Sequence, residues 1–149
     1  MWNRIKTPKE LALKVKTPQK LSRWIRWNIS TIKPLYGSWP TPEEVLRIKG
    51  AFCKGYAVLA YSTLKHMGYM PSLVTFMWRN YAGNLVSHAI CVFHEGSRWC
   101  YFDNGVLRFC GNGQGSLATV ARYACPREVY AAFERNERGE LIETLITEV

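Results

Sequence analysis

The stretch Ala51-Phe52-Cys53-Lys54-Gly55-Tyr56-Ala57 begins the segment that decides the fold. From Cys53, apolar residues recur at i+3, i+4, i+7, i+11 and i+14, as far as Met67, which predicts one amphipathic helix. Gly68 follows and supplies a helix stop. The pattern therefore places the Cys53 thiol in the first turn of a helix, on the face that is buried against the rest of the molecule.

Three Thr-Pro steps precede this helix and predict three shorter helices. Thr is a favoured N-cap and Pro suits the first helical position, so we expect helices at 8–15, 18–29 and 42–48. The first and third steps also fit the S/T-x-x-E capping box. A helical first third therefore leads into the helix that begins at Cys53.

Strands are predicted after that helix. Runs of β-branched and aromatic residues indicate strands at 73–78, 86–93, 98–103 and 106–110, with a short helix at 117–124. The tail from 128 to 149 is compatible with a helix or a hairpin, and alternation at Val129, Ala131 and Phe133 favours the hairpin. Helices that lead into an antiparallel sheet make an α+β domain. We expect a basic helical arm at 1–30 and a main domain at 31–149 that carries the Cys53 helix and the sheet, within one globular unit.

Strand arithmetic connects His88 with Asp103. If Glu95-Gly96 is a two-residue turn, or Phe93 and Arg98 close a longer loop, opposed positions sum to 191 and His88 faces Asp103. A bulge at Gly96 would break this register. The register also makes two groups of opposed pairs: Ile90/Tyr101 and Val92/Trp99 toward the Cys53 helix, and Cys91/Cys100 on the other face.

Cys53, His88 and Asp103 are the residue types of a nucleophile, a base and a base-orienting acid. A helix N-terminus and a nearby imidazolium both favour the thiolate, which is the reactive form. A carboxylate would fix the tautomer of the histidine and stabilise its charged form. Backbone N–H groups at the helix start would stabilise an oxyanion. A lone Cys53 or a lone His88 would more often be a structural residue. The helix pattern places Cys53 and the strand register places His88 beside Asp103, and these two independent arguments together predict a thiol enzyme.

The charge of the chain is concentrated in its first third. Residues 1–50 carry eleven Lys and Arg against three Glu, or +8, whereas 51–149 carry nine against eight acidic residues, or +1. A basic, Trp-containing arm of this kind could contact nucleic acid or an acidic partner. The plainer interpretation is a solvated helix face.

The cysteines and the apolar pattern indicate the redox state of the thiols and the cellular compartment. Five cysteines without a CxxC pair indicate free thiols, with a Cys91–Cys100 disulfide as the alternative. No run of about 18 apolar residues exists, and no apolar signal segment is visible, so we expect a cytoplasmic protein with no membrane contact. The three histidines are not spaced with the cysteines as zinc ligands, and no metal or organic cofactor is expected.

The ordered blocks around these residues resemble the transglutaminase-like superfamily of papain-like thiol enzymes, especially its small bacterial and phage-borne cysteine peptidases. The resemblance covers about residues 36–110 and rests on these blocks: Trp39-Pro40-Thr41-Pro42-Glu43-Glu44-Val45-Leu46, Cys53-Lys54-Gly55-Tyr56-Ala57, Leu64-Lys65-His66-Met67-Gly68-Tyr69, Ser87-His88-Ala89-Ile90-Cys91-Val92-Phe93 and Trp99-Cys100-Tyr101-Phe102-Asp103-Asn104.

The resemblance implies a catalytic role for each residue of the proposed triad. It makes Cys53 the nucleophile, His88 the base and Asp103 the orienting acid, in a fold that packs the cysteine helix on an antiparallel sheet. The family often has Gly-Asp-Cys-x-Asp at the nucleophile, whereas this chain has Ala51-Phe52-Cys53-Lys54-Gly55. An upstream side chain often assists the oxyanion hole there, and Tyr36 or Trp39 could take that place.

Three functions are compatible with these observations. The first is an acyl-transfer enzyme that acts on amide bonds of a protein or peptide, with water or an amine as acceptor. The second is an inactive relative that binds partners through its basic arm. The third is a redox-sensing protein that uses Cys91 and Cys100.

Overall fold

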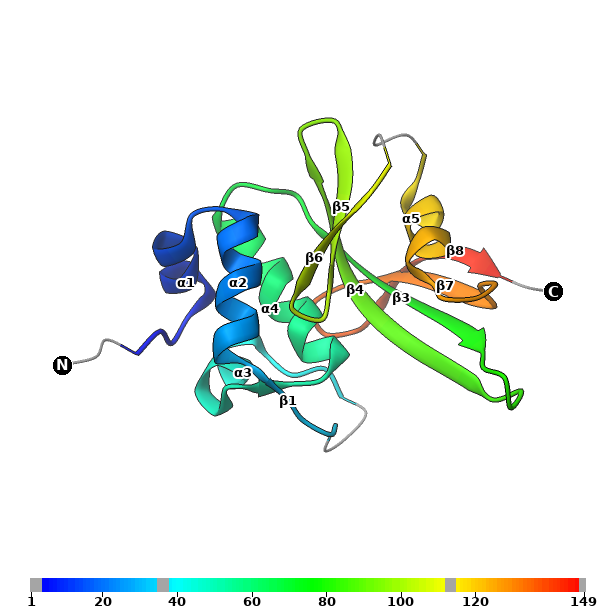
Figure 1. The fold of residues 1–149 in the computed structure, drawn as a ribbon, viewed down its shortest axis with the longest axis horizontal. Helices are drawn as coiled ribbons and strands as arrows, with labels where there is room; N and C mark the ends of the chain where they lie inside the picture. The colour runs from blue at the N-terminus through cyan, green and yellow to red at the C-terminus, as the bar shows by residue number, and fades with distance from the viewer. Residues whose placement is uncertain (1–3, 35–37, 112–114, 148–149) are drawn as a thin grey trace.

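Helices lie on both faces of one antiparallel sheet in the computed structural model, which describes residues 4–34, 38–111 and 115–147 (Figure 1). The elements are, in chain order, α1 (Pro8–Val15), α2 (Pro18–Asn28), β1 (Ser30–Thr31), α3 (Pro42–Ile48), β2 (Gly50–Ala51), α4 (Cys53–His66), β3 (Ser72–Arg79), β4 (Leu85–Glu95), β5 (Arg98–Asp103), β6 (Val106–Cys110), α5 (Leu117–Ala124), β7 (Ala131–Arg135) and β8 (Leu141–Thr147). Within those ranges, no helix has the length and apolar character that crossing a bilayer requires.

The main sheet has the strand order β6-β5-β4-β3-β7-β8, and every neighbouring pair is antiparallel. β1 and β2 form a separate short parallel pair beside α4. The predicted α+β class is therefore confirmed. The hairpin predicted for the tail is confirmed too, because β7 pairs with β8.

The first three helices begin as their Thr-Pro steps predict. In each, Pro occupies the first turn and the Thr hydroxyl accepts the backbone N–H three residues on, at 3.2 Å: Glu10 to Thr7, Lys20 to Thr17 and Glu44 to Thr41. These bonds satisfy N–H groups that have no partner within the helix.

Two apolar cores lie on opposite faces of the sheet. α4 covers one face, where Leu59 and Leu64 contact a cluster that includes Cys91 and Phe102. α5 covers the other face, where Val120 and Ala121 belong to a second cluster. That second cluster holds Ile90, Val92 and Tyr101. The prediction that these residues pack toward the Cys53 helix is therefore wrong, since they lie under α5.

The β4–β5 register differs from the predicted one by two residues. Gly96 and Ser97 form the turn, Glu95 opposes Arg98, and Asp103 opposes Ile90, so opposed positions sum to 193. Gly96 has φ +63, which the first position of such tight turns requires and glycine adopts freely. An even shift still leaves residues that were predicted to share a face on the same face as one another. It removes the predicted Cys91/Cys100 pair, because Cys91 opposes Phe102 and Cys100 opposes Phe93.

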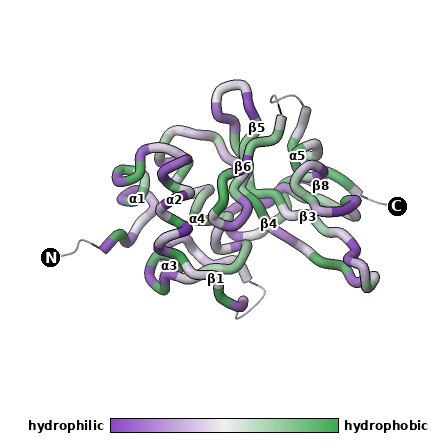
Figure 2. Tube along the Cα trace, viewed as in Figure 1, coloured by the Kyte–Doolittle hydropathy of each residue, from purple (hydrophilic) through white to green (hydrophobic). Residues whose placement is uncertain are grey.

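The basic arm packs on the rest of the fold through both α1 and α2, and α2 also contacts the end of the sheet near Asp103. Its apolar side chains Leu21 and Ile25 are fully buried, whereas Figure 2 shows hydrophilic stretches between the apolar ones along α1 and α2. The buried Ser22 hydroxyl donates to the Gly105 carbonyl at 2.7 Å and accepts the Leu107 N–H at 3.1 Å. The first 30 residues therefore hold the β5–β6 turn, which directly follows Asp103.

Candidate active site

Cys53 is the first residue of α4, and its thiol is half-buried. The preceding residue, Phe52, caps the helix without a side-chain hydrogen bond. Instead the backbone N–H groups of Lys54 and Ala89 and the ring of His88 lie close enough to the sulfur to favour its negative charge. The uncapped helix start therefore turns its N–H groups and its positive dipole end toward the sulfur.

His88 and Asp103 form the second contact of the site. Nε2 of His88 lies 2.7 Å from Oδ1 of Asp103, with the two side chains 21% and 33% exposed. Phe76 contacts the imidazole edge-on, with ring centroids 5.7 Å apart, and restricts its orientation. Because Nε2 is used by Asp103, Nδ1 is the nitrogen that is left for the thiol. Arg108 adds a 3.5 Å contact to the second carboxylate oxygen.

The three groups meet at a margin of the sheet. β5 ends at Asp103, opposite Ile90, so the part of β4 from Leu85 to Ala89 has no β5 partner. The start of α4 lies there, which lets a backbone N–H of β4 reach the sulfur of Cys53. His88 and Asp103 are diagonal neighbours and not the directly opposed pair that was predicted. Diagonal pairs on one face are within reach of long side chains, so their hydrogen bond still forms.

Electrostatics favour a thiolate–imidazolium pair. Burial alone would raise the pKa of Cys53, but the hydrogen bond and charge of His88 and the two backbone N–H groups outweigh it and lower this pKa. Burial opposes charge on His88, yet Asp103 and Cys53 raise the pKa of its imidazole to about 9. The hydrogen bond with His88 lowers the pKa of Asp103. Charged forms of all three groups are thus mutually stabilised.

The other cysteines differ from Cys53 in both exposure and acidity. Cys91, Cys100, Cys110 and Cys125 are buried, and all of them are free thiols. Burial raises the pKa of each, that of Cys100 to about 11. Since a thiol reacts as its thiolate, Cys53 is the one cysteine of the five whose surroundings favour reaction.

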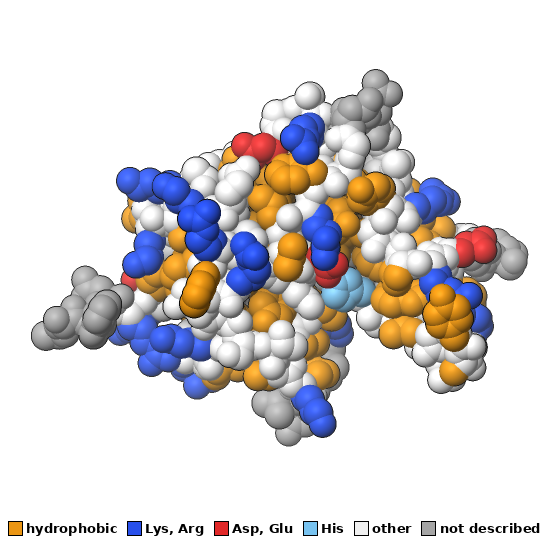
Figure 3. All heavy atoms as spheres, in the orientation of Figure 1, with side chains coloured by type: hydrophobic (Ala, Val, Ile, Leu, Met, Phe, Trp, Pro, Cys, Tyr) orange, Lys and Arg blue, Asp and Glu red, His pale blue; other side chains and the backbone are white. Residues whose placement is uncertain are grey.

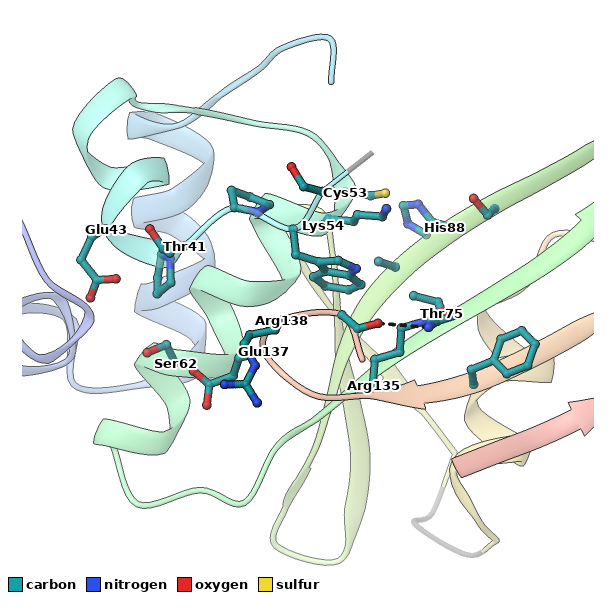
Figure 4. A pocket seen from close by; sticks show the side chains of 18 of the residues that line it. Thr41, Glu43, Cys53, Lys54, Ser62, Thr75, His88, Arg135, Glu137 and Arg138 are labelled. Carbon is teal, nitrogen blue, oxygen red and sulfur yellow. Dashed lines mark hydrogen bonds between the residues drawn. The ribbon is translucent and has the colours of Figure 1, made fainter. Parts of the chain in front are cut away.

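A groove of about 780 Å³ opens beside the thiol (Figure 4). We call it the active-site groove, and it is lined by residues from four parts of the chain: Ser38 to Glu43 before and within α3, Cys53, Lys54 and Ser62 of α4, Thr75, Met77, Ser87, His88 and Ala89 of β3 and β4, and Phe133, Arg135, Glu137, Arg138 and Gly139 around the β7–β8 turn.

The two predicted oxyanion candidates have different outcomes. Tyr36 lies outside the described residues. Trp39 lines the active-site groove, and Nζ of Lys54 is 5.6 Å from its ring centroid. The indole packs against Gly139, where a Cβ would overlap the ring and where φ is +82. Trp39 therefore joins α4 to the β7–β8 turn across the groove. The backbone N–H of Lys54, at the start of α4, is the group near the sulfur that could stabilise an oxyanion.

Two contributors to the site carried no clear sequence signal. The Ala89 N–H is a backbone group on an otherwise apolar strand, and only the position where β5 ends frees it for the thiol. Arg135 enters the groove from β7, more than eighty residues beyond Cys53 in the chain. Among the described residues, no group of three or more His, Cys, Asp and Glu side chains is placed to hold a metal ion.

Comparison with known proteins finds similarity of structure alone. No protein-family model matches the sequence, and no curated protein matches it. The chain is similar to LapG of Legionella pneumophila in a calcium-bound structure, with a TM-score of 0.51 and 16% identity, over 81% of this chain and 65% of that one. A second LapG structure gives a TM-score of 0.48 at 16% identity, over 87% of this chain and 67% of that one.

The similarity concerns the fold. LapG has a papain-like, transglutaminase-like fold, so the architecture expected from the sequence is confirmed. This chain spans 65% of the length of the calcium-bound LapG chain.

Proposed function

We propose that this protein is a thiol-dependent acyl-transfer enzyme of the transglutaminase-like superfamily that acts on amide bonds of a protein or peptide. Cys53 is the nucleophile, His88 the general acid and base, and Asp103 the orienting acid. One observation carries the proposal: His88, hydrogen-bonded to Asp103 at 2.7 Å, lies close enough to Cys53 to lower the pKa of its thiol, at the wall of a groove large enough for a peptide.

Acylation follows from the charges of the site. The Cys53 thiolate attacks the amide carbon, forming a C–S bond while the carbonyl electrons move to oxygen. Backbone N–H groups at the α4 start stabilise the oxyanion. His88, already protonated, gives its proton to the departing amine as the C–N bond breaks. Asp103 keeps the imidazole oriented and stabilises its charged form before that transfer.

Deacylation returns the enzyme to its first state. His88, now neutral, removes a proton from water or from an incoming amine as that nucleophile attacks the thioester carbon. The C–S bond then breaks, and Cys53 leaves as the thiolate beside the protonated His88. Water yields a carboxylic acid and completes peptidase or amidase action, whereas an amine yields a new amide. These steps draw on protein groups alone. An intracellular, reducing setting belongs to the same proposal, because it keeps the Cys53 thiol free.

Site-resolved alkylation tests the proposal. Iodoacetamide at neutral pH should modify Cys53 well before the four buried cysteines, as judged by peptide mass spectrometry. A panel of peptide and side-chain amides should then trap an acyl-enzyme on Cys53, and Cys53→Ala should abolish it. Cys110→Ser is the matched control, because this thiol is buried and Cys110 pairs with Trp99, at the other end of the β5–β6 ladder from Asp103. Modification of Cys53 no faster than the other cysteines would exclude the mechanism.

We propose nucleic-acid binding as a second role, for the basic arm. Lys and Arg side chains gather over α1, α2 and α3 (Figure 3), and among the described residues no Lys or Arg of this region takes part in an ion pair with an acidic side chain. Trp27 is 84% exposed at the end of α2, where a base could stack on it. Unpaired cations beside an exposed aromatic side chain suit a single-stranded nucleic acid.

Charge reversal tests this role without disturbing the fold. Deletion of the arm would expose α4 and remove the Ser22 bonds, so Lys20→Glu with Arg23→Glu is preferable. Both side chains are exposed on one face of α2. Anisotropy with a labelled single-stranded DNA should show salt-dependent binding that the double variant loses and that Arg122→Glu, on α5, retains. Equal binding by both variants, or binding only to an acidic protein, would refute the proposal.

A further inference from the structure

Arg135 is a rigidly held cation in the active-site groove. It ends β7, is half-buried, and lines the same groove as Cys53. Nε donates to Oγ1 of Thr75 at 2.9 Å, a bond drawn in Figure 4, and Nη1 donates to the Gly139 carbonyl at 3.1 Å. The guanidinium also lies 5.2 Å from the centroid of the Phe133 ring. Three contacts from different strands and a turn therefore fix its orientation.

The charge of Arg135 is not neutralised by any acidic side chain in the described part of the chain. None of the ion pairs among the described residues includes Arg135. A guanidinium has five N–H donors, and the two hydrogen bonds above use two of them. Both N–H groups of Nη2 therefore have no partner in the described part of the chain. These free donors on a fixed guanidinium are available to an anionic ligand.

Two other charged side chains near Arg135 in the groove are already in ion pairs. Arg138 is paired with Glu140 at 2.9 Å, and Glu137 is paired with Lys65 at 3.5 Å. Glu43 lies at the end of the groove away from Cys53 and Thr75 in Figure 4. Arg135 therefore differs from Arg138 and Glu137 in having no ion-pair partner among the described residues.

We propose that Arg135 binds a carboxylate of the substrate, so that the substrate is a peptide or protein with an acidic side chain close to the amide that Cys53 attacks. This inference rests on the proposed function and specifies its substrate class. A guanidinium binds a carboxylate through two parallel hydrogen bonds, and a fixed guanidinium loses little freedom when it does so. The same chemistry would accept a free C-terminal carboxylate, and the experiment separates the two sources.

Matched covalent probes measure this preference directly. Tripeptidyl chloromethyl ketones that carry Glu or Gln at one position in turn should inactivate Cys53 at different rates. The Glu probe should react about 10- to 100-fold faster than its Gln partner at one position, the discrimination expected of a charged hydrogen-bonded pair. N-chloroacetyl dipeptides that end in a carboxylate or in an amide form the second arm. A preference in that arm alone would assign the carboxylate to a peptide C-terminus and overturn the acidic side chain.

Three variants attribute the preference to Arg135. Arg135→Gln should bring the Glu-to-Gln rate ratio close to unity, whereas Arg135→Lys should keep part of it, because the charge remains without the fork. Arg138→Gln is the matched control in the same groove, and it should keep the wild-type ratio, since Glu140 already pairs with that guanidinium. A purely structural role for Arg135 would slow both probes equally and leave the ratio unchanged.

The outcomes separate this inference from the proposed function. If iodoacetamide labels Cys53 but the Glu and Gln probes react equally in the wild type, the carboxylate site is refuted and the thiol enzyme stands. If the ratio survives in folded Arg135→Gln, Arg135 is not the binding residue. If Cys53 reacts with no probe, the thiol enzyme itself fails. If thermal melting shows that Arg135→Gln is unfolded, the Glu-to-Gln rate ratio of Arg135→Lys decides. A ratio in Arg135→Lys equal to that of the wild type would refute bidentate binding of the carboxylate by the Arg135 guanidinium.

Discussion

Two neighbouring helices, α3 and α4, begin in opposite ways. α3 starts with Thr41-Pro42, its Thr hydroxyl accepts the Glu44 N–H, and acidic side chains occupy its first turn. α4 starts with Phe52-Cys53, has no side-chain cap and has Lys54 in place of an acid. Every helix start presents unpaired N–H groups and a positive dipole end. The sequence of α3 satisfies these groups locally, whereas the start of α4 leaves them without a side-chain cap beside the Cys53 sulfur. In the proposed enzyme, the first helix start serves stability and the second serves reactivity.

His88→Ala should have the largest effect on the α4 side of this comparison. Without the imidazolium, the pKa of Cys53 should rise, because burial raises it and the charge and hydrogen bond of His88 no longer oppose that effect, so alkylation at pH 6.5 should slow. Turnover of an amide substrate should fall by about 10² to 10⁴. The measurement is the iodoacetamide rate against pH. A profile identical to that of the wild type would show that the helix start alone activates the thiol.

Asp103→Asn should have a smaller effect that is specific to histidine. The pKa of His88 is about 9 instead of its ordinary 6.5, so its contribution to stability is complete below 6.5 and is lost as pH rises through about 9. The variant should lower this pKa by about one to three units, since an adjacent carboxylate raises it. NMR titration of the His88 ring measures the shift. In denaturant unfolding between pH 6.5 and about 9, the free energy of unfolding of the variant should depend less on pH than that of the wild type. An unchanged midpoint would assign the raised pKa to Cys53.

Phe52→Asp should make α4 begin like α3. An aspartate at the N-cap accepts a helix N–H and places a negative charge near the sulfur, so the pKa of Cys53 should rise. Alkylation at pH 6.5 should fall by about 2- to 5-fold. Phe52→Asn is the control that caps without charge and repeats the loss of the aromatic ring. Equal rates for the two variants would mean that loss of the ring, and not the charge, changes the thiol.

Thr7→Ala and Thr17→Ala should have the smallest effect on reactivity. Each removes a cap far from the groove, so the free energy of unfolding should fall by about 1 kcal/mol per variant. Urea denaturation measures this loss, and the iodoacetamide rate of Cys53 should stay at its wild-type value. A slower rate in either variant would mean that α1 or α2 controls the site beyond the Ser22 contacts.

The helix starts and the strand faces could be predicted because their causes are local. Thr7, Thr17 and Thr41 each precede Pro, and a short-range hydrogen bond together with the fixed geometry of proline starts a helix at each of these steps. The placement of His88 and Asp103 on one face survived a wrong register, because side chains alternate with a period of two and the error was even. Their hydrogen bond was therefore predicted correctly from an incorrect pairing.

The turn between β4 and β5 could not be fixed from sequence. Glu95-Gly96 and Gly96-Ser97 are both compatible with a glycine turn, and the choice moves every opposed pair by two positions. The face that α4 covers was also predicted wrongly, since alternation identifies two faces without naming the helix that packs on each. Both decisions depend on contacts between segments far apart in the chain.

The sequence by itself determined the elements, the helix start that carries Cys53 and the shared face of His88 and Asp103, because dihedral preferences, capping and periodicity act over a few residues. Only the tertiary structure decided that β5 ends where α4 begins, that the Ala89 N–H reaches the sulfur, and that Arg135 enters the same groove with no acidic partner among the described residues. Those features arise where distant segments pack together, and packing selects among surfaces that local patterns leave equivalent.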